Sequence, residues 1–285
     1  MSSVPEALAY IPKPSAGSAR AYTHSCNTIN GTTFSNGGIC KLDIPTSEFA
    51  SYLDAKNSFI KLTLKNTSGQ SFTLDGYIQA ILSRFTVEFA SYSLEDVSDM
   101  GVLHSLMQDN QIDFGTLKTA MSITQGTSGS ENRAGATVAN GASVTCTFPL
   151  PSFILGLMAS KYIPIGAMSA DSGIGLSLYI QNAGIGVVTG ADSHSGAFEV
   201  SSVSYEAQMI KLDTDVEAMV RRSTGGVYRI HGETYRSYNH TLAQSSTQSS
   251  INVPIKCPSL KTLHVVHRYT ANVTGVDKGS ITNRT

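Results

Sequence analysis

The stretch that decides the fold reads Ile-Gly-Leu-Ser-Leu-Tyr-Ile-Gln and covers residues 174–181. Large apolar residues alternate there with small or polar ones, so an extended chain would turn one face to a core and the other to solvent. The same period of two recurs at 38–45, 58–66, 84–89 and 143–150. This alternation is typical of antiparallel strands whose two faces meet different surroundings.

Working outward from these segments, the alternation predicts eight strands, and a phase shift at Ser201-Ser202 predicts a bulge in the last one. The strands are expected at 38–45, 58–66, 71–90, 116–124, 143–150, 162–168, 174–181 and 198–210. Eight antiparallel strands within about 170 residues fit an all-β, eight-stranded antiparallel jelly-roll sandwich. A plain immunoglobulin-like sandwich ranks lower, because that fold has no use for a long internal helix.

The internal helix is expected at residues 93–110, where apolar residues recur at helical spacing. Ser93 and Asp96 have the spacing of a capping box at its first turn. His104 lies off the apolar stripe of this helix and is expected to be solvated. A short helical turn is expected at 152–158.

A second helix is expected at residues 213–222, directly after the last predicted strand. Thr214 and Glu217 are interpreted as its capping pair. Arg221 and Arg222 stand in the last turn, where the helix dipole favours positive charge. This helix therefore has sequence signals at both ends.

The chain is expected to have three parts: an extended N-terminal arm over 1–35, a first jelly roll over 36–211, and a linker helix with the beginning of a second jelly roll over 212–285. The arm has no strong period and contains three prolines. Alternation restarts at 250–256 and 259–268. Because two or three strands leave open edges, the second roll is expected to be incomplete and to need further sequence or another chain.

The composition excludes several classes of function. Only 14% of the 285 residues are charged, the net charge is −1, and Ser and Thr contribute 38 and 27 residues. Lys and Arg form no block, so direct nucleic-acid binding is not expected, because phosphate neutralisation needs clustered cations. No apolar run is long enough for a membrane span, and no signal peptide is visible at the start. A weakly charged surface rich in hydroxyls favours tiling against copies of the same chain.

The search for reactive groups predicts no catalytic, cofactor-binding or metal-binding residue, and the chain is not expected to be an enzyme. The four cysteines lack the paired spacing of a zinc or redox site and are interpreted chiefly as buried thiols. They are Cys26, Cys40, Cys146 and Cys257. His264 and His267 fall on opposite faces of a predicted strand, so they do not form a metal pair.

Three runs of sequence resemble the major capsid proteins of the double-jelly-roll viral lineage, and within it those of polinton-like viruses. The runs are Phe148-Pro-Leu-Pro-Ser-Phe-Ile-Leu-Gly156, Lys161-Tyr-Ile-Pro-Ile-Gly166 and Gly175-Leu-Ser-Leu-Tyr-Ile180. Similar pieces are Tyr52-Leu-Asp54, Ser93-Leu-Glu-Asp-Val97 and Gly279-Ser-Ile-Thr-Asn-Arg284.

The resemblance implies a structural protein of the virion with two jelly rolls in each subunit. Three subunits would form a trimer of pseudo-hexagonal outline, and trimers would tile an icosahedral shell around double-stranded DNA. The implied partners are other copies of the chain, penton and minor capsid proteins, and an internal membrane beneath the shell. A full double-roll protein is longer than this sequence.

A second function considered is a receptor- or glycan-binding β-sandwich, such as a viral fibre head or an adhesin. Loops rich in small polar residues at 126–142 and 184–196 would supply its binding surface. In a shell protein the same loops would lie at the outer rim. The two functions differ in assembly, because a binding head forms small discrete oligomers and a shell protein forms lattices.

Overall fold

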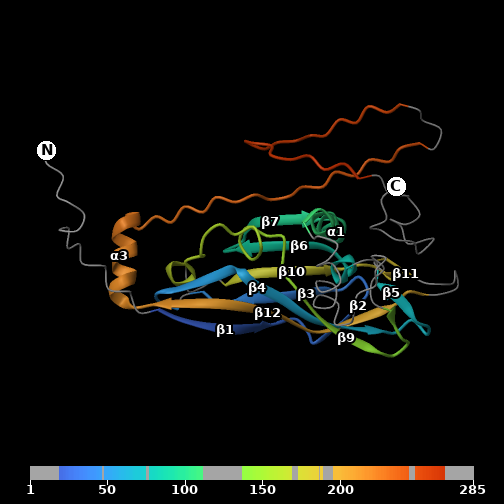
Figure 1. Ribbon diagram of the computed structural model, residues 1–285, viewed down its shortest axis with the longest axis horizontal. Coiled ribbons are helices and arrows are strands. Elements are labelled where there is room, and N and C mark those ends of the chain that lie inside the picture. The colour runs from blue at the N-terminus through green and yellow to red at the C-terminus, as the bar shows by residue number, and fades with distance from the viewer. Residues whose placement is uncertain are drawn as a thin grey trace, which may run out of the picture.

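Two antiparallel sheets packed face to face form the body of the molecule (Figure 1). The computed structural model describes residues 19–46, 48–74, 77–111, 137–168, 173–185, 187–188, 195–243 and 248–266. The first sheet has the order β1 (Ala19–Asn27), β12 (Phe198–Leu212), β4 (Ser51–Asn66) and β9 (Ser143–Phe148). The second has the order β3 (Ile39–Ile44), β10 (Ile174–Ile180), β6 (Leu82–Phe89) and β7 (Tyr92–Ser98).

Four short strands extend this framework. A three-residue strand, β2 (Thr33–Ser35), pairs with β12. A small third sheet places β5 (Phe72–Leu74) between β11 (Val187–Val188) and β8 (Thr137–Val138). The helices of the described chain are α1 (Met100–Gln111) and α3 (Thr214–Thr224), together with single 3-10 turns at Ile78–Ile81 and Ile165–Ala167.

The eight long strands of the described residues pair in a nested order. Counted along the chain, the first pairs with the eighth and the second with the seventh. The third pairs with the eighth and the sixth, and the fourth pairs with the seventh and the fifth. This nesting is that of two Greek keys wound into a jelly roll. The predicted all-β antiparallel jelly-roll sandwich is therefore confirmed.

The core lies between the two sheets and follows the predicted alternation. In β10 every second residue from Ile174 to Ile180 is buried, and β9 buries alternate residues ending at Phe148. Each large apolar side chain that becomes fully buried contributes about 1.5–3 kcal/mol to stability. Tyr205 lies fully inside, and its hydroxyl donates to the carbonyl oxygen of Leu155 at 3.1 Å, so its polar atom is satisfied.

The start of the predicted helix 93–110 is wrong, because residues 92–98 form β7 against β6. The helix α1 begins only at Met100. The inward positions of β7 are Glu95 and Val97, and a buried carboxylate hides the alternation of a strand. His104 is also corrected: it lies on α1 but is only 1% exposed.

The expected N-terminal arm is wrong over its described part. Residues 19–27 form β1, which pairs with β12 over nine consecutive residues, and residues 33–35 form β2. β1 escapes periodicity analysis because only Cys26 among its residues is buried.

Three local predictions have different outcomes. Pro164 interrupts 162–168, which forms one isolated bridge from Ile163 to Leu53 and a 3-10 turn in place of a strand. Residues 152–158 form turns and not a helix. The bulge in β12 is confirmed, because its register against β4 shifts between Ser201 and Ser204. The predicted strand 116–124 lies outside the described residues.

The helix α3 forms where it is predicted, but with a different cap. Asp213 is the N-cap residue, and its carboxylate accepts from the backbone N–H of Thr214 at 2.7 Å. Gly225 ends the helix with φ of 62°, a left-handed conformation that glycine adopts without steric cost. The predicted partner of Thr214, Glu217, instead turns into the protein and is 2% exposed.

After α3 the described chain at 226–243 and 248–266 contains no helix or strand. The described parts of the two predicted strands, 250–256 and 259–266, therefore have no ladder here. A strand needs a neighbour to satisfy its backbone groups, and none is present for these residues within the described chain. The second jelly roll accordingly stays a prediction.

Candidate assembly surfaces

The junction between α3 and the first sheet is held by one buried carboxylate. The Tyr52 hydroxyl donates to Oε2 of Glu217 at 2.7 Å, and Nε of Arg221 donates to Oε1 at 3.0 Å. Burial and the neighbouring carboxylate raise the pKa of Tyr52, so the phenol keeps the proton that it donates. A buried charge with such partners fixes geometry, because any displacement would leave it unpaired.

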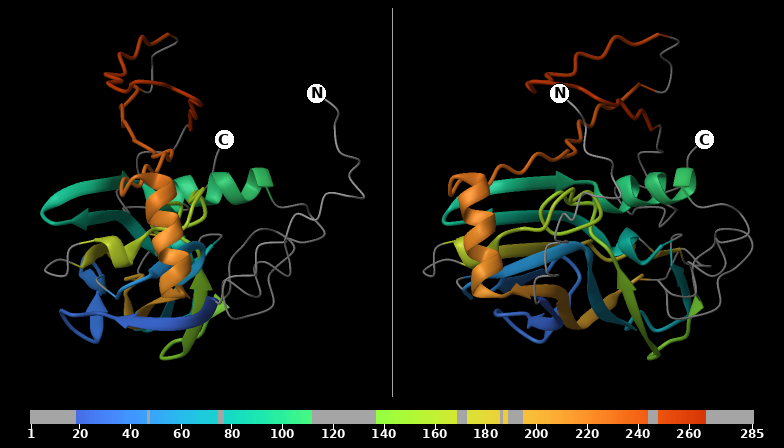
Figure 2. Two further views of the ribbon diagram at one scale, coloured as in Figure 1. Left: turned by 90° about the vertical axis from the view of Figure 1, so that its left-hand side faces the viewer. Right: turned by 60° about the vertical axis from the view of Figure 1, so that its left-hand side comes forward.

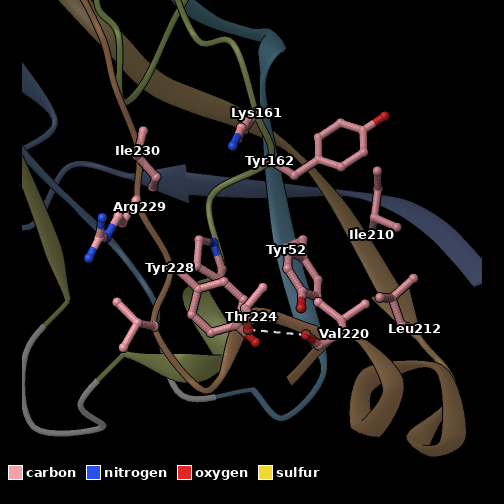
Figure 3. A pocket seen from close by; sticks show the side chains of 12 residues that line it. Tyr52, Lys161, Tyr162, Ile210, Leu212, Val220, Thr224, Tyr228, Arg229 and Ile230 are labelled. Atoms are coloured by element: carbon pink, nitrogen blue, oxygen red, sulfur yellow. Dashed lines mark hydrogen bonds between the residues drawn. The ribbon is translucent and has the colours of Figure 1, made fainter. Parts of the chain in front are cut away.

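A cavity of about 720 Å³ opens beside this junction (Figure 3). Its walls come from the start of β4, the segment 161–164, the end of β12, α3 and the chain that follows α3. In the view of Figure 3, Tyr52 lies between Tyr228 and the β12 residues Ile210 and Leu212. The lining residues are Tyr52, Lys161, Tyr162, Pro164, Ile210, Leu212, Val220, Thr224, Val227, Tyr228, Arg229 and Ile230. Aliphatic and tyrosine side chains dominate, so the cavity suits an apolar partner surface better than a reaction.

The segment that follows α3 runs along one side of the sandwich and then leaves it (Figures 1 and 2). Near its start, the carbonyl oxygen of His231 accepts from Ser160 Oγ at 3.2 Å. Further on, Asn239 Nδ2 donates to Asp99 Oδ2 at 3.0 Å. Further along, Lys261 forms an ion pair with Glu233 of the same segment.

Apolar side chains of this segment and of α3 are exposed to a degree unusual for a stable surface. Met219 on α3 is 68% exposed, and Leu263 and Val265 are 60% and 72% exposed. The others are Val227, Tyr238, Leu242, Ile251, Ile255 and Leu260. Large apolar side chains exposed along one segment fit a place where another protein surface packs.

The outer face of the first sheet is polar, with hydroxyls interspersed among charges of both signs such as Lys61, Lys65 and Glu206. Thr63 and Thr145 share a hydrogen bond of 3.0 Å across neighbouring strands. Thr23 donates to Gln208 at 3.1 Å on the same sheet. Hydroxyls already bonded to each other cost little to remove from water, which suits a face that meets another subunit.

Two buried titratable groups serve the fold, although the sequence predicts Glu95 within a helix and His104 in solvent. Glu95 accepts from Ser152 Oγ and, at 3.1 Å, from the N–H of Phe153, so it anchors the turn at 152–158 to β7. Burial raises the pKa of Glu95. Burial lowers the pKa of His104 to about 4, so this imidazole is neutral near neutral pH. Alternation of apolar residues carries no signal for either position.

The cysteines and the remaining ligand-type residues show no reactive arrangement among the described residues. Burial raises the pKa of Cys26, Cys40 and Cys146 to about 12, and a thiol that keeps its proton is a poor nucleophile. No group of three His, Cys, Asp or Glu side chains in the described ranges could hold a metal ion. Within those ranges, no helix has the length and apolar character needed to cross a membrane.

The nested pairing of eight long strands, with α1 inserted between β7 and β9, defines a protein of the jelly-roll fold. Two similar solved structures come from the virus PBCV-1. One is its protein VP54, as a crystal structure fitted into a cryo-EM reconstruction of the virophage Sputnik, and the other is a quasi-atomic model of the PBCV-1 virus capsid.

Each of these structures is 15% identical to this chain, with a TM-score of 0.50. The match covers 72% of this chain and 45% of the other, so the chain spans less than half the length of the structures it matches. At this identity the likeness shows the fold. No family model and no curated protein matches the sequence.

Proposed function

We propose that this chain is a structural subunit of a viral shell, without catalytic activity, and that it contains the first roll of a double-jelly-roll major capsid protein of the polinton-like type. Three subunits associate into a trimer of pseudo-hexagonal outline. Trimers tile an icosahedral shell in the virion, where they meet penton and minor capsid proteins. An internal membrane beneath the shell is a further partner.

The observation that carries the proposal is the exposed segment after α3. Its apolar side chains alternate at strand spacing in Ile251, Val253 and Ile255 and again in Leu263 and Val265. These residues have strand-type sequence but no strand neighbour in the described chain. A second roll, standing beside the first, supplies the neighbour they need. The 45% coverage of the VP54 chain supports this division.

The junction at α3 supports a fixed angle between the two rolls. The helix is capped at both ends by Asp213 and Gly225 and anchored through Glu217 to Tyr52. A capped, anchored helix transmits its direction to the chain that follows. A subunit with a rigid junction presents both rolls to its neighbours in one geometry, which a regular lattice requires.

Low charge supports shell building in preference to direct DNA binding. The chain has 20 basic and 21 acidic residues. Within the described part of the chain, four basic residues are paired with carboxylates: Arg84, Lys211, Arg221 and Lys261. A surface of this kind lacks the clustered cations that release counterions from nucleic acid.

The test is the assembly state of the purified protein, expressed from its complete reading frame and viewed by negative-stain electron microscopy. The expected result is trimers of hexagonal outline, with lattices at higher concentration. The double substitution Leu263→Glu with Val265→Glu should abolish trimers while leaving the circular dichroism of the sandwich unchanged. Thr262→Glu, which adds one charge directly before these positions, is the control and should still assemble. Discrete small oligomers that bind glycans saturably would overturn the proposal in favour of a receptor-binding head.

A further inference from the structure

The outer edge of β1 is a long backbone edge with no partner strand among the described residues. β1 is the terminal strand of its sheet, and β12 pairs with only one of its sides. Figures 1 and 2 both show it at the periphery of the sandwich. Its nine residues span roughly 30 Å at about 3.3 Å per residue. The edge therefore presents a row of backbone N–H and C=O groups to the surroundings.

This edge lacks the devices that normally protect a sheet edge. Natural edge strands are kept short, charged, bulged or interrupted by proline. β1 has no proline, its only Lys or Arg is Arg20, and its register with β12 runs without a shift from Ala19 to Asn27. It is also nine residues long. A straight, nearly uncharged edge of this length is a template for strand addition.

β1 also differs from the other three terminal strands in burial. β9, β3 and β7 each bury at least two of their residues against the core. In β1 only Cys26 is buried, and Tyr22 is half-buried, while every other residue is exposed. Because β1 buries so few side chains in its own core, pairing with a strand of another molecule would add much of its stabilisation.

The sequence of β1 is complementary to itself in the antiparallel direction. If two copies meet with Thr23 opposite Thr23, then Tyr22 faces His24 and Ala21 faces Ser25. Arg20 then faces Cys26, so no two like charges stand opposite each other. Cross-strand threonine pairs and small-residue pairs are favourable in such ladders. An antiparallel pair of identical strands has a twofold axis, and the twofold dimer is the commonest symmetry of homo-oligomers.

We propose that two copies of this chain pair through β1, antiparallel about a twofold axis at Thr23, so that their first sheets join into one continuous sheet. The pairing does not depend on the proposed shell function. If that function holds, the joined sheet links neighbouring capsomers, and the contact is distinct from the pairing of the segment after α3 with the second roll.

The proposal predicts a charge-swap effect at Thr23. In the Thr23→Lys variant two ammonium groups meet at the axis, and in Thr23→Glu two carboxylates meet. Each variant should associate with itself at least about tenfold more weakly than the parent, while an equimolar mixture should recover the parent affinity as a mixed dimer. Sedimentation velocity over a concentration series measures both. All proteins carry Leu263→Glu with Val265→Glu, so that these exposed apolar side chains of the segment after α3 do not contribute to association.

The matched control is Thr145, an exposed threonine on β9 at the opposite edge of the same sheet. Thr145→Lys and Thr145→Glu should leave self-association unchanged. In the proposed register the two Thr23 Cα atoms are about 4.5–5.5 Å apart, which a disulfide can span. Oxidised Thr23→Cys should therefore form a covalent dimer, and Thr145→Cys should not. A parent protein that stays monomeric throughout the series, or charge variants whose mixture fails to recover, would overturn the proposal.

Discussion

The buried imidazole of His104 should make the protein lose stability on mild acidification. It is 1% exposed on α1 and lies against the 3-10 turn at 78–81, with its Nε2 3.4 Å from Nε2 of Gln79. Burial lowers the pKa of His104 from 6.5 to about 4, against a smaller opposing effect of the Pro149 carbonyl. In the unfolded chain the ring recovers its ordinary pKa. Protonation therefore favours the unfolded state.

The sign and size of the effect follow from this difference. The pKa of His104 is lower in the folded protein than in the unfolded chain. The neutral imidazole therefore makes its full contribution to the free energy of unfolding above pH 6.5, and this contribution is lost as the pH falls toward 4. At about 1.4 kcal/mol per pH unit, this gap corresponds to about 3 kcal/mol of unfolding free energy. Glu95 acts in the opposite direction, because its raised pKa adds stability as the pH falls. The effect of His104 must therefore be measured as a difference between variants.

The assay compares the parent with His104→Leu by urea denaturation at intervals from pH 7.5 to pH 4. The free energies of unfolding are taken from transitions with the same m value, which shows that the unfolded states are comparable. The parent should lose about 3 kcal/mol relative to His104→Leu across this range. Parallel curves for the two proteins would refute the buried, neutral imidazole as the source of acid sensitivity.

Two further predictions concern the α3 junction and the thiols. Tyr52→Phe leaves the Glu217 carboxylate without the hydroxyl that donates to it at 2.7 Å. The substitution should lower the free energy of unfolding by about 1–3 kcal/mol and speed hydrogen exchange in α3. An unchanged exchange rate in α3 would contradict the anchoring role. In the folded protein at pH 8, a thiol reagent should modify the exposed Cys257 and leave the three buried thiols unmodified until denaturant is added. Rapid modification of all four thiols without denaturant would contradict the burial of these three. The spared thiols are Cys26, Cys40 and Cys146.

Much of the sandwich could be predicted from sequence, because most of its strands bury one face only. The alternation in 174–180 and 143–148 is complete, and both segments are strands within a residue or two of the predicted bounds. Two of the eight long strands lack clean alternation and escape prediction. β1 is exposed on both faces, and β7 turns the Glu95 carboxylate inward. Periodicity detects a strand only when one face carries apolar residues and the other carries polar residues. Neither β1 nor β7 shows this difference between its faces.

The candidate surfaces were less predictable than the fold, for a related reason. Glu217 has the right spacing for a capping partner of Thr214, and local spacing cannot reveal that Tyr52, 165 positions away, binds it instead. The edge of β1 is likewise defined by pairing with β12, which the chain reaches only near residue 200. Long-range partners decide both features, and no local pattern contains them.

The central place of β12 in the first sheet also sets the order of events on the ribosome. This strand pairs with β1, β2 and β4, yet it is the last strand of the roll to be made. Until Leu212 has left the exit tunnel, β1, β2 and β4 have been synthesised but lack the strand with which they all pair. Contacts between residues so distant in sequence also form slowly. A nascent chain in a crowded polysome is therefore at greatest risk of pairing with the wrong molecule just before translation of the roll is complete.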